Sequence, residues 1–97
     1  MTMYNPPHPG EFIKDVYLTP LKVSPRSVAI KLQVSPSTFS RLLNYKSAIS
    51  PKMALRLSKC LGRTPESWLT MQDNYNLWHA KEEIDLSKIE PLVAVPA

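Results

Sequence analysis

Residues 24–44 read SPRSVAIKLQVSPSTFSRLLN, and this stretch decides the fold. It contains two Ser-Pro pairs eleven residues apart, Ser24-Pro25 and Ser35-Pro36, each followed by apolar residues at helical spacing. A serine at the N-cap accepts a hydrogen bond from an amide of the first turn, and proline at the next position lacks the amide hydrogen that would otherwise stay unpaired. The spacing therefore predicts two short helices joined by a tight turn.

These two helices, expected at about 25–32 and 36–44, have the proportions of a helix-turn-helix. Ala29 is a small residue where two helices must cross closely, and Phe39 and Leu42 give the second helix an inward face. The outward face is small, polar and basic. A helix that enters the DNA major groove with its N-terminal end reads bases from such positions.

The same helix-start signal recurs on the C-terminal side at Ser50-Pro51 and Thr64-Pro65, and a further start lies at Pro9. These signals predict helices at about 9–19, 51–61 and 65–81 in addition to the first two, with Phe12, Ile13, Val16 and Tyr17 forming the inward face of the first. The sequence therefore predicts an all-α, five-helix domain over residues 9–83. Residues 1–8 form an N-terminal arm and residues 84–97 a tail, which Pro91 and Pro96 prevent from forming a long helix.

The charge of the chain is strongly segregated, because residues 16–65 contain no acidic side chain although the chain has eight. The same block contains nine basic side chains, and the rest of the chain sums to −5. Neutralisation of phosphates supplies most of the non-specific affinity for nucleic acids, so this block is typical of a surface that faces a polyanion. The nine are Lys22, Arg26, Lys31, Arg41, Lys46, Lys52, Arg56, Lys59 and Arg63.

Composition argues against an enzyme, a metal site or a cofactor. The single cysteine, Cys60, cannot form an internal disulfide, and it has no zinc-ligand spacing with His8 or His79. Two glycines exclude a glycine-rich phosphate loop, and no base, nucleophile and partner stand at a workable spacing. His8 and Glu11 are expected to serve the arm and the first helical turn. No apolar run approaches the length of a membrane span, so we expect a cytoplasmic protein without a membrane partner.

Several motifs together resemble the HigA antitoxin family, also called VapI, of the Cro/C1-type repressor class. The resemblance runs from about residue 8 to residue 93 and rests on HPGE at 8–11, LQVSPSTFSRLLN at 32–44, ISPKMALRL at 49–57, and ESWL at 66–69 followed by Gln72 and YNLW at 75–78. It implies a lambda-repressor-like DNA-binding domain that represses its own operon as a homodimer. It also implies a partner toxin like HigB, a small messenger-RNA-cleaving ribonuclease of the RelE type.

Carried over residue by residue, the resemblance implies two groups of DNA contacts. Base reading falls to Pro36, Ser37, Thr38 and Arg41. Phosphate binding falls to Ser24, Arg26, Ser35, Asn44 and Lys46. The alternative is structural: Ser37 and Thr38 fill the first helical turn, and Arg41 is a solvated surface side chain.

Gln33 and Tyr45 stand where the family pattern has glycine. A left-handed conformation at Gln33 costs about 1 kcal/mol relative to glycine, which a packed domain can absorb.

The last helix carries a broad apolar stripe formed by Trp68, Met71, Tyr75 and Trp78. Trp68 is expected in the core of the monomer, because side chains this large dominate small cores. Tyr75 and Trp78, with Met71, are expected at a dimer interface, and packing within one chain is the alternative.

Three functions remain open from the sequence. The first is a sequence-specific DNA-binding antitoxin that represses its own operon and neutralises a toxin. The second is a stand-alone Cro/C1-type transcriptional regulator without a toxin. The third is a protein-interaction module that has lost DNA binding, and the acid-free block argues against it.

Overall fold

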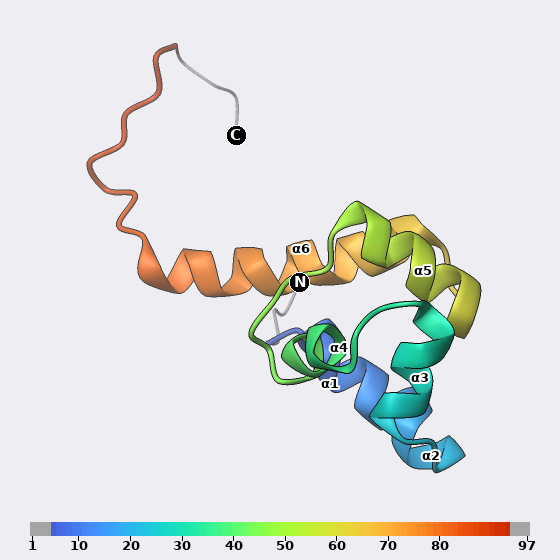
Figure 1. Cartoon of the computed structure of the whole chain (residues 1–97). Helices are drawn as coiled ribbons and strands as arrows, with labels where there is room; N and C mark the ends of the chain where they lie inside the picture. Colours follow the sequence, from blue (N-terminus) through green and yellow to red (C-terminus); the bar gives the residue numbers. More distant parts are fainter. Residues whose placement is uncertain (1–4, 94–97) are drawn as a thin grey trace.

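The computed structural model describes residues 5–93, which form helices and no strand. Three consecutive elements, α1 (Pro9–Ile13), a π-helical turn (Lys14–Leu18) and α2 (Thr19–Leu21), make one helical rod, as Figure 1 shows. The other helices are α3 (Pro25–Leu32), α4 (Pro36–Leu43), α5 (Pro51–Leu61) and α6 (Pro65–Glu83). The all-α, five-helix prediction is confirmed.

Helices α3 to α6 begin at the four Ser-Pro and Thr-Pro pairs. In each, the hydroxyl oxygen of the N-cap residue accepts a hydrogen bond from the backbone N–H three residues on, and proline takes the first helical position. The four caps are Ser24, Ser35, Ser50 and Thr64, with N···O distances of 3.1, 3.2, 3.1 and 3.1 Å. Each such cap contributes about 1 kcal/mol to stability.

The first rod differs from its predicted form because Pro20 interrupts its hydrogen bonding. Proline has no N–H to donate to the preceding turn, and the chain opens into a π-helical turn just before it. The wider turn rotates the following residues about the helix axis. As a result Val16, expected inward, is 44% exposed, and Leu18 is buried in its place.

Two non-glycine residues take the left-handed conformation at the ends of α3 and α4. They are Gln33 (φ 63°) and Tyr45 (φ 63°), the positions where the family pattern has glycine. Both helices end in a Schellman motif, in which the N–H of the residue after the left-handed one returns to a carbonyl of the last turn: Val34 to Ala29 at 3.1 Å and Lys46 to Arg41 at 2.8 Å.

The core lies where the first rod, α3, α4 and α5 meet the first half of α6. Its largest fully buried side chains are Trp68, Phe39, Ile13, Leu42, Leu57 and Pro9. Gly10 brings α1 against α4: a Cβ atom at Gly10 would lie 2.3 Å from the carbonyl oxygen of Leu42. This close approach fixes the position of α4 in the domain.

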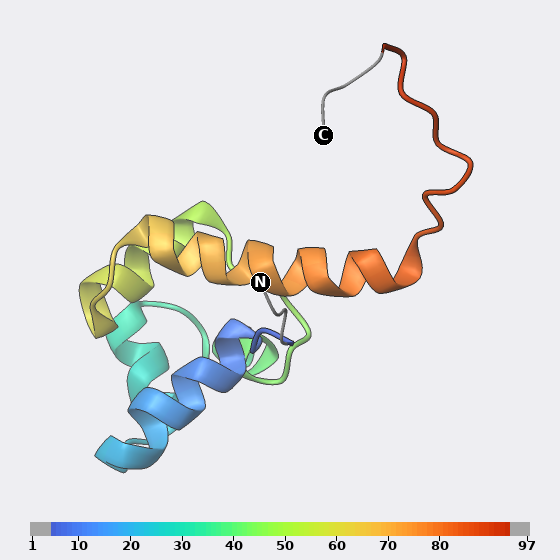
Figure 2. The ribbon, with the colours of Figure 1, turned by 180° about the vertical axis from the view of Figure 1, so that it is seen from behind.

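The second half of α6 projects from this body, and the tail that follows it contains no helix up to Val93 (Figures 1 and 2). The molecule is accordingly long, with extents of 52 × 24 × 23 Å. The parts of the predicted arm and tail at 1–4 and 94–97, including Val95 and Pro96, lie outside the described residues. Within the described range, no helix has the length and apolar character needed to cross a membrane.

Candidate nucleic-acid interface

The first turn of α4 carries a cluster of three hydroxyl groups. The Ser35 hydroxyl lies 2.8 Å from that of Thr38 and 3.2 Å from that of Ser37, and it also caps the helix. Thr38 is half-buried, whereas Ser37 and Pro36 are exposed. The structure therefore brings together three of the predicted DNA-contacting residues, and it gives Thr38 a structural bond in addition to any contact with a base.

Arg41 lies in the last turn of α4 and its side chain is exposed. Phe39 and Leu42 on the same helix are buried, with 0% and 1% exposure, so α4 presents two distinct faces. The outward face of an eight-residue helix with exposed residues in its first turn and an exposed arginine has the form of a major-groove recognition helix.

The predicted phosphate-binding residues lie around the ends of α3 and α4. Ser24 caps α3, and the exposed Arg26 follows in its first turn. Asn44 is at the C-terminal end of α4, where its side-chain amide donates to the Ser40 hydroxyl at 3.3 Å, and Lys46 follows it with an exposed side chain. Helix N-termini and exposed polar and basic side chains are the usual donors to phosphate oxygens.

An aromatic stack fixes the chain just after α4. The rings of His8 and Tyr45 stack with centroids 4.8 Å apart, and the Lys14 ammonium lies 5.1 Å from the centre of the Tyr45 ring. The other side of His8 meets Tyr75 of α6 edge-on at 4.8 Å. The segment around Lys46, which is predicted to bind phosphate, is thus tied to α1 and to α6.

His8, expected in the arm, is instead a buried part of the folded body that positions α1 and the segment after α4. It is buried, and its Nδ1 accepts a hydrogen bond from the Gly10 N–H at 2.9 Å, so His8 is the N-cap of α1. Burial lowers the pKa of His8, the Lys14 charge acts in the same direction, and a hydrogen bond with the Ser47 backbone acts against them. The neutral ring is the form that can accept at Nδ1. His8-Pro9 repeats the pattern of a capping residue followed by proline that begins the other helices, and this pattern is the sequence signal that identifies His8 as the N-cap.

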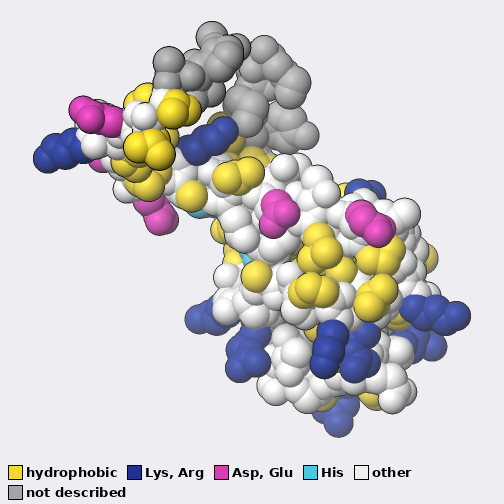
Figure 3. Space-filling model, turned by 90° about the horizontal axis from the view of Figure 1, so that it is seen from above, with side chains coloured by type: hydrophobic (Ala, Val, Ile, Leu, Met, Phe, Trp, Pro, Cys, Tyr) yellow, Lys and Arg dark blue, Asp and Glu magenta, His cyan; other side chains and the backbone are white. Residues whose placement is uncertain are grey.

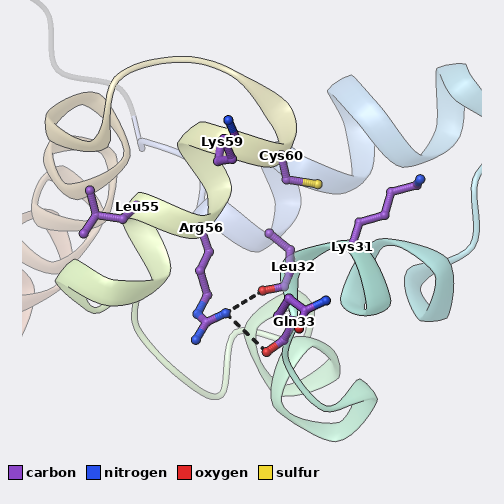
Figure 4. Close-up of a pocket in the computed structure, with 7 residues that line it drawn as sticks. All are labelled: Lys31, Leu32, Gln33, Leu55, Arg56, Lys59 and Cys60. Atoms are coloured by element: carbon purple, nitrogen blue, oxygen red, sulfur yellow. Dashed lines mark hydrogen bonds between the residues drawn. The ribbon is translucent and has the colours of Figure 1, made fainter.

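A cleft of about 520 Å³ lies between α3 and α5, and Figure 4 shows its lining. Within it, one guanidinium nitrogen of Arg56 donates to the carbonyl oxygens of Leu32 and Gln33, at 2.8 and 3.2 Å. Arg56 therefore satisfies free carbonyls at the end of α3 and supports the left-handed Gln33 in the turn. Lys31, Lys59 and Cys60 also line the cleft, so it is basic.

All nine basic side chains of the acid-free block are exposed. Across residues 5–93, the only ion pair joins His79 and Glu82, at 3.6 Å, so none of the nine is neutralised by a neighbouring carboxylate. In Figure 3, most Lys and Arg side chains of the body lie along its lower edge, and the Asp and Glu side chains in view lie above this edge and toward the tail, where Lys side chains are also present. On the face in view, the charge segregation of the sequence is thus visible at the surface of the body.

The apolar stripe on α6 divides between the core and the projecting half of the helix. Trp68 is 0% exposed, and its indole N–H donates to the Gly62 carbonyl at 2.9 Å. Met71 packs against the core, and Tyr75 contacts His8. Trp78 is partly exposed and lies one helical turn further out than Tyr75.

Among the described residues, no group of three or more potential ligands could hold a metal ion.

An exposed recognition helix, set in a five-helix body with an unneutralised basic surface, defines a helix-turn-helix domain of the Cro/C1 repressor class. The chain is 41% identical over 93 residues to the HTH-type transcriptional regulator YddM of Escherichia coli K12, covering 96% of this chain and 98% of the relative. It is 32% identical over 80 residues to antitoxin HigA-1 of Vibrio cholerae, covering 82% and 75% of the two chains.

Among solved structures, the chain is similar to Pseudomonas aeruginosa antitoxin HigA with the higBA promoter. The TM-score is 0.80 at 33% identity, and the match covers 91% of this chain and 99% of that one. A comparison with protein-family models gave no match. From these likenesses, the chain belongs to the HigA family of helix-turn-helix antitoxins.

Proposed function

We propose that this protein is an antitoxin that binds operator DNA in its own promoter and neutralises a messenger-RNA-cleaving toxin. The observation that supports this most directly is the outward face of α4, which carries the exposed Arg41, with the exposed Arg26 and Lys46 near the ends of α3 and α4 and no ion pair to any of the three among residues 5–93. The solved structure of the similar Pseudomonas aeruginosa antitoxin HigA with the higBA promoter supports the same assignment. A protein with these two tasks acts in the cytoplasm, where operator and messenger RNA are found.

In this proposal, direct base reading is divided unequally among Pro36, Ser37, Thr38 and Arg41. Arg41 can donate two parallel hydrogen bonds to a guanine edge, whereas Pro36 has no N–H and can only touch a thymine methyl. Ser37 reads a base with its exposed hydroxyl. Thr38 reads a base only with the bonding capacity that its hydroxyl does not use for Ser35, because the two hydroxyl oxygens already lie 2.8 Å apart.

Arg41→Ala and Lys46→Ala separate base reading from phosphate binding. Arg41→Ala should lower discrimination at one base pair by roughly 1–3 kcal/mol, while Lys46→Ala should weaken binding to all sequences alike. The measurement is a titration of operator, single-base variants and random duplex, with Lys59→Ala as a control for loss of a lysine elsewhere. Equal loss on operator and random DNA for both variants would contradict this division.

We infer that the protein binds its operator as a homodimer, because one eight-residue recognition helix covers a single half-site. Two such helices about 34 Å apart reach successive major grooves on one face of the duplex. The projecting half of α6 offers a contact surface in Trp78, which is partly exposed, and the adjacent Leu77, which is exposed. Met71 and Tyr75 belong to its inner edge, since both also contact their own chain.

Trp78→Ala tests this interface more cleanly than a change at Tyr75, which would also disturb the His8 stack. We expect the substitution to weaken the dimer by about 2 kcal/mol or more, because buried aromatic side chains concentrate interface energy. Light scattering across micromolar concentrations measures the effect, and Leu55→Ala, an exposed apolar position on α5, is the control. A Trp78→Ala protein that stays fully dimeric at micromolar concentration would place the dimer contact elsewhere.

The stand-alone regulator is distinguished from the antitoxin by co-expression with the product of the adjacent gene. A stable complex supports the antitoxin, and a chain that binds its operator but captures no partner supports the regulator. An interaction module without DNA binding would fail to bind operator at any salt concentration.

A further inference from the structure

We propose that residues 82–93, here called the acidic arm, are the docking segment for the basic RNA-binding face of the partner toxin. The proposal rests on the function proposed above and assigns the toxin contact to one part of the surface. The acidic arm comprises the last two residues of α6 and the described part of the tail.

The acidic arm exposes apolar side chains at a density that is unusual for a surface. Five of its twelve residues are large and apolar, and each is more than half exposed, with Leu92 at 99%. Single exposed apolar residues are ordinary, but a contiguous set bordered by charges marks an interaction site. The five are Ile84, Leu86, Ile89, Leu92 and Val93.

The charge of the acidic arm selects among possible occupants. It has four acidic side chains and one basic one, Lys88, in contrast to the acid-free block that forms the DNA surface. DNA and RNA are excluded by this charge, and a second copy related by a two-fold axis would place like charges together. A ribonuclease must bind the phosphates of its substrate, so its RNA-binding face is basic and complements the arm. The acids are Glu82, Glu83, Asp85 and Glu90.

The arm also has a local shape, which two hydrogen bonds define. The Ser87 N–H donates to a carboxylate oxygen of Asp85 at 2.9 Å, and the Ile89 N–H donates to the Leu86 carbonyl at 3.0 Å, which bends the chain in a turn. The bonds from Ser87 lower the pKa of Asp85, so this carboxylate is ionised at neutral pH.

The position of the arm leaves the DNA surface free. In Figures 1 and 2 the tail leaves α6 on the side away from α1, α3 and α4. A toxin bound there would not cover α4, so operator and toxin can bind one antitoxin together. The α3–α5 cleft is a less suitable site for the toxin, because it is lined by Lys31, Arg56 and Lys59 and would repel a basic partner.

The test uses the full chain and the tagged product of the adjacent toxin gene, purified separately and titrated against each other. One variant reverses the charge of the arm (Glu82→Lys, Glu83→Lys, Asp85→Lys and Glu90→Lys), and a second removes apolar contacts (Leu86→Ser, Ile89→Ser and Leu92→Ser). The control reverses charge in the cleft (Lys31→Glu with Lys59→Glu). We expect each arm variant to bind toxin at least about 100-fold more weakly, because several contacts are lost at once, and the control to bind as wild type.

The outcomes separate this inference from the proposed function. If the wild-type chain binds no toxin, the antitoxin function fails. If wild type binds toxin and both arm variants bind it equally well, the arm assignment is overturned while the antitoxin function stands. Operator binding and light scattering of the arm variants complete the test: unchanged values support the toxin as occupant, and loss of the dimer in both variants would make a second copy the occupant instead.

Discussion

Gly10→Ala should destabilise the domain by about 2 kcal/mol or more, and it should weaken operator binding although Gly10 is buried. The new Cβ would lie 2.3 Å from the Leu42 carbonyl oxygen and 2.9 Å from the Leu43 Cα, both in the backbone of the recognition helix. Alanine gains at most about 1 kcal/mol in helix propensity, whereas forcing extra volume into a packed contact costs about 1–3 kcal/mol and more where backbone must move. The cost of the steric clash therefore exceeds the gain in helix propensity, and α1 and α4 must move apart.

Urea denaturation and operator titration of Gly10→Ala measure the two effects. Lys52→Ala is the matched control for stability, because Lys52 is exposed and occupies the same second position of α5 that Gly10 occupies in α1. If the Gly10→Ala protein unfolds within about 0.5 kcal/mol of wild type, as a surface substitution would, then the α1–α4 contact is not tight in solution.

Operator affinity should fall roughly 10³-fold when monovalent salt rises from about 50 mM to about 200 mM, given about six phosphate contacts per dimer. The reason is the release of counterions from DNA as basic side chains neutralise its phosphates. The nine exposed basic residues of the block have no carboxylate within ion-pair distance among residues 5–93, so those that face DNA, such as Lys46, can neutralise phosphates.

Binding isotherms at four or more salt concentrations give the slope of log affinity against log salt. Lys46→Ala should reduce that slope by about one for each phosphate contact removed. Lys59→Ala, in the α3–α5 cleft, should leave the slope unchanged. An affinity independent of salt would be incompatible with a phosphate-binding surface on this block.

The sequence by itself determined the helices and the kind of surface they form. Each of the four caps from Ser24 to Thr64 bonds an amide only three residues away, so the signal that starts each helix is contained in its own first turn. The alternation of buried Phe39 and Leu42 with exposed Arg41 follows from helical periodicity in the same way. The charge segregation is a property of composition and needed no coordinates.

Only the tertiary structure decided how these helices hold the recognition helix in place. His8 stacks on Tyr45 and meets Tyr75 edge-on, and the Ile49 N–H donates to the Gln72 side chain at 2.9 Å. These pairs lie 23 to 67 residues apart in the chain, and no local spacing encodes a contact over such separations. The burial of His8 depends on the distant residues Tyr45 and Tyr75 that pack on its ring, so local spacing does not show it, whereas the exposure of Val16 follows from the π-helical turn just before Pro20.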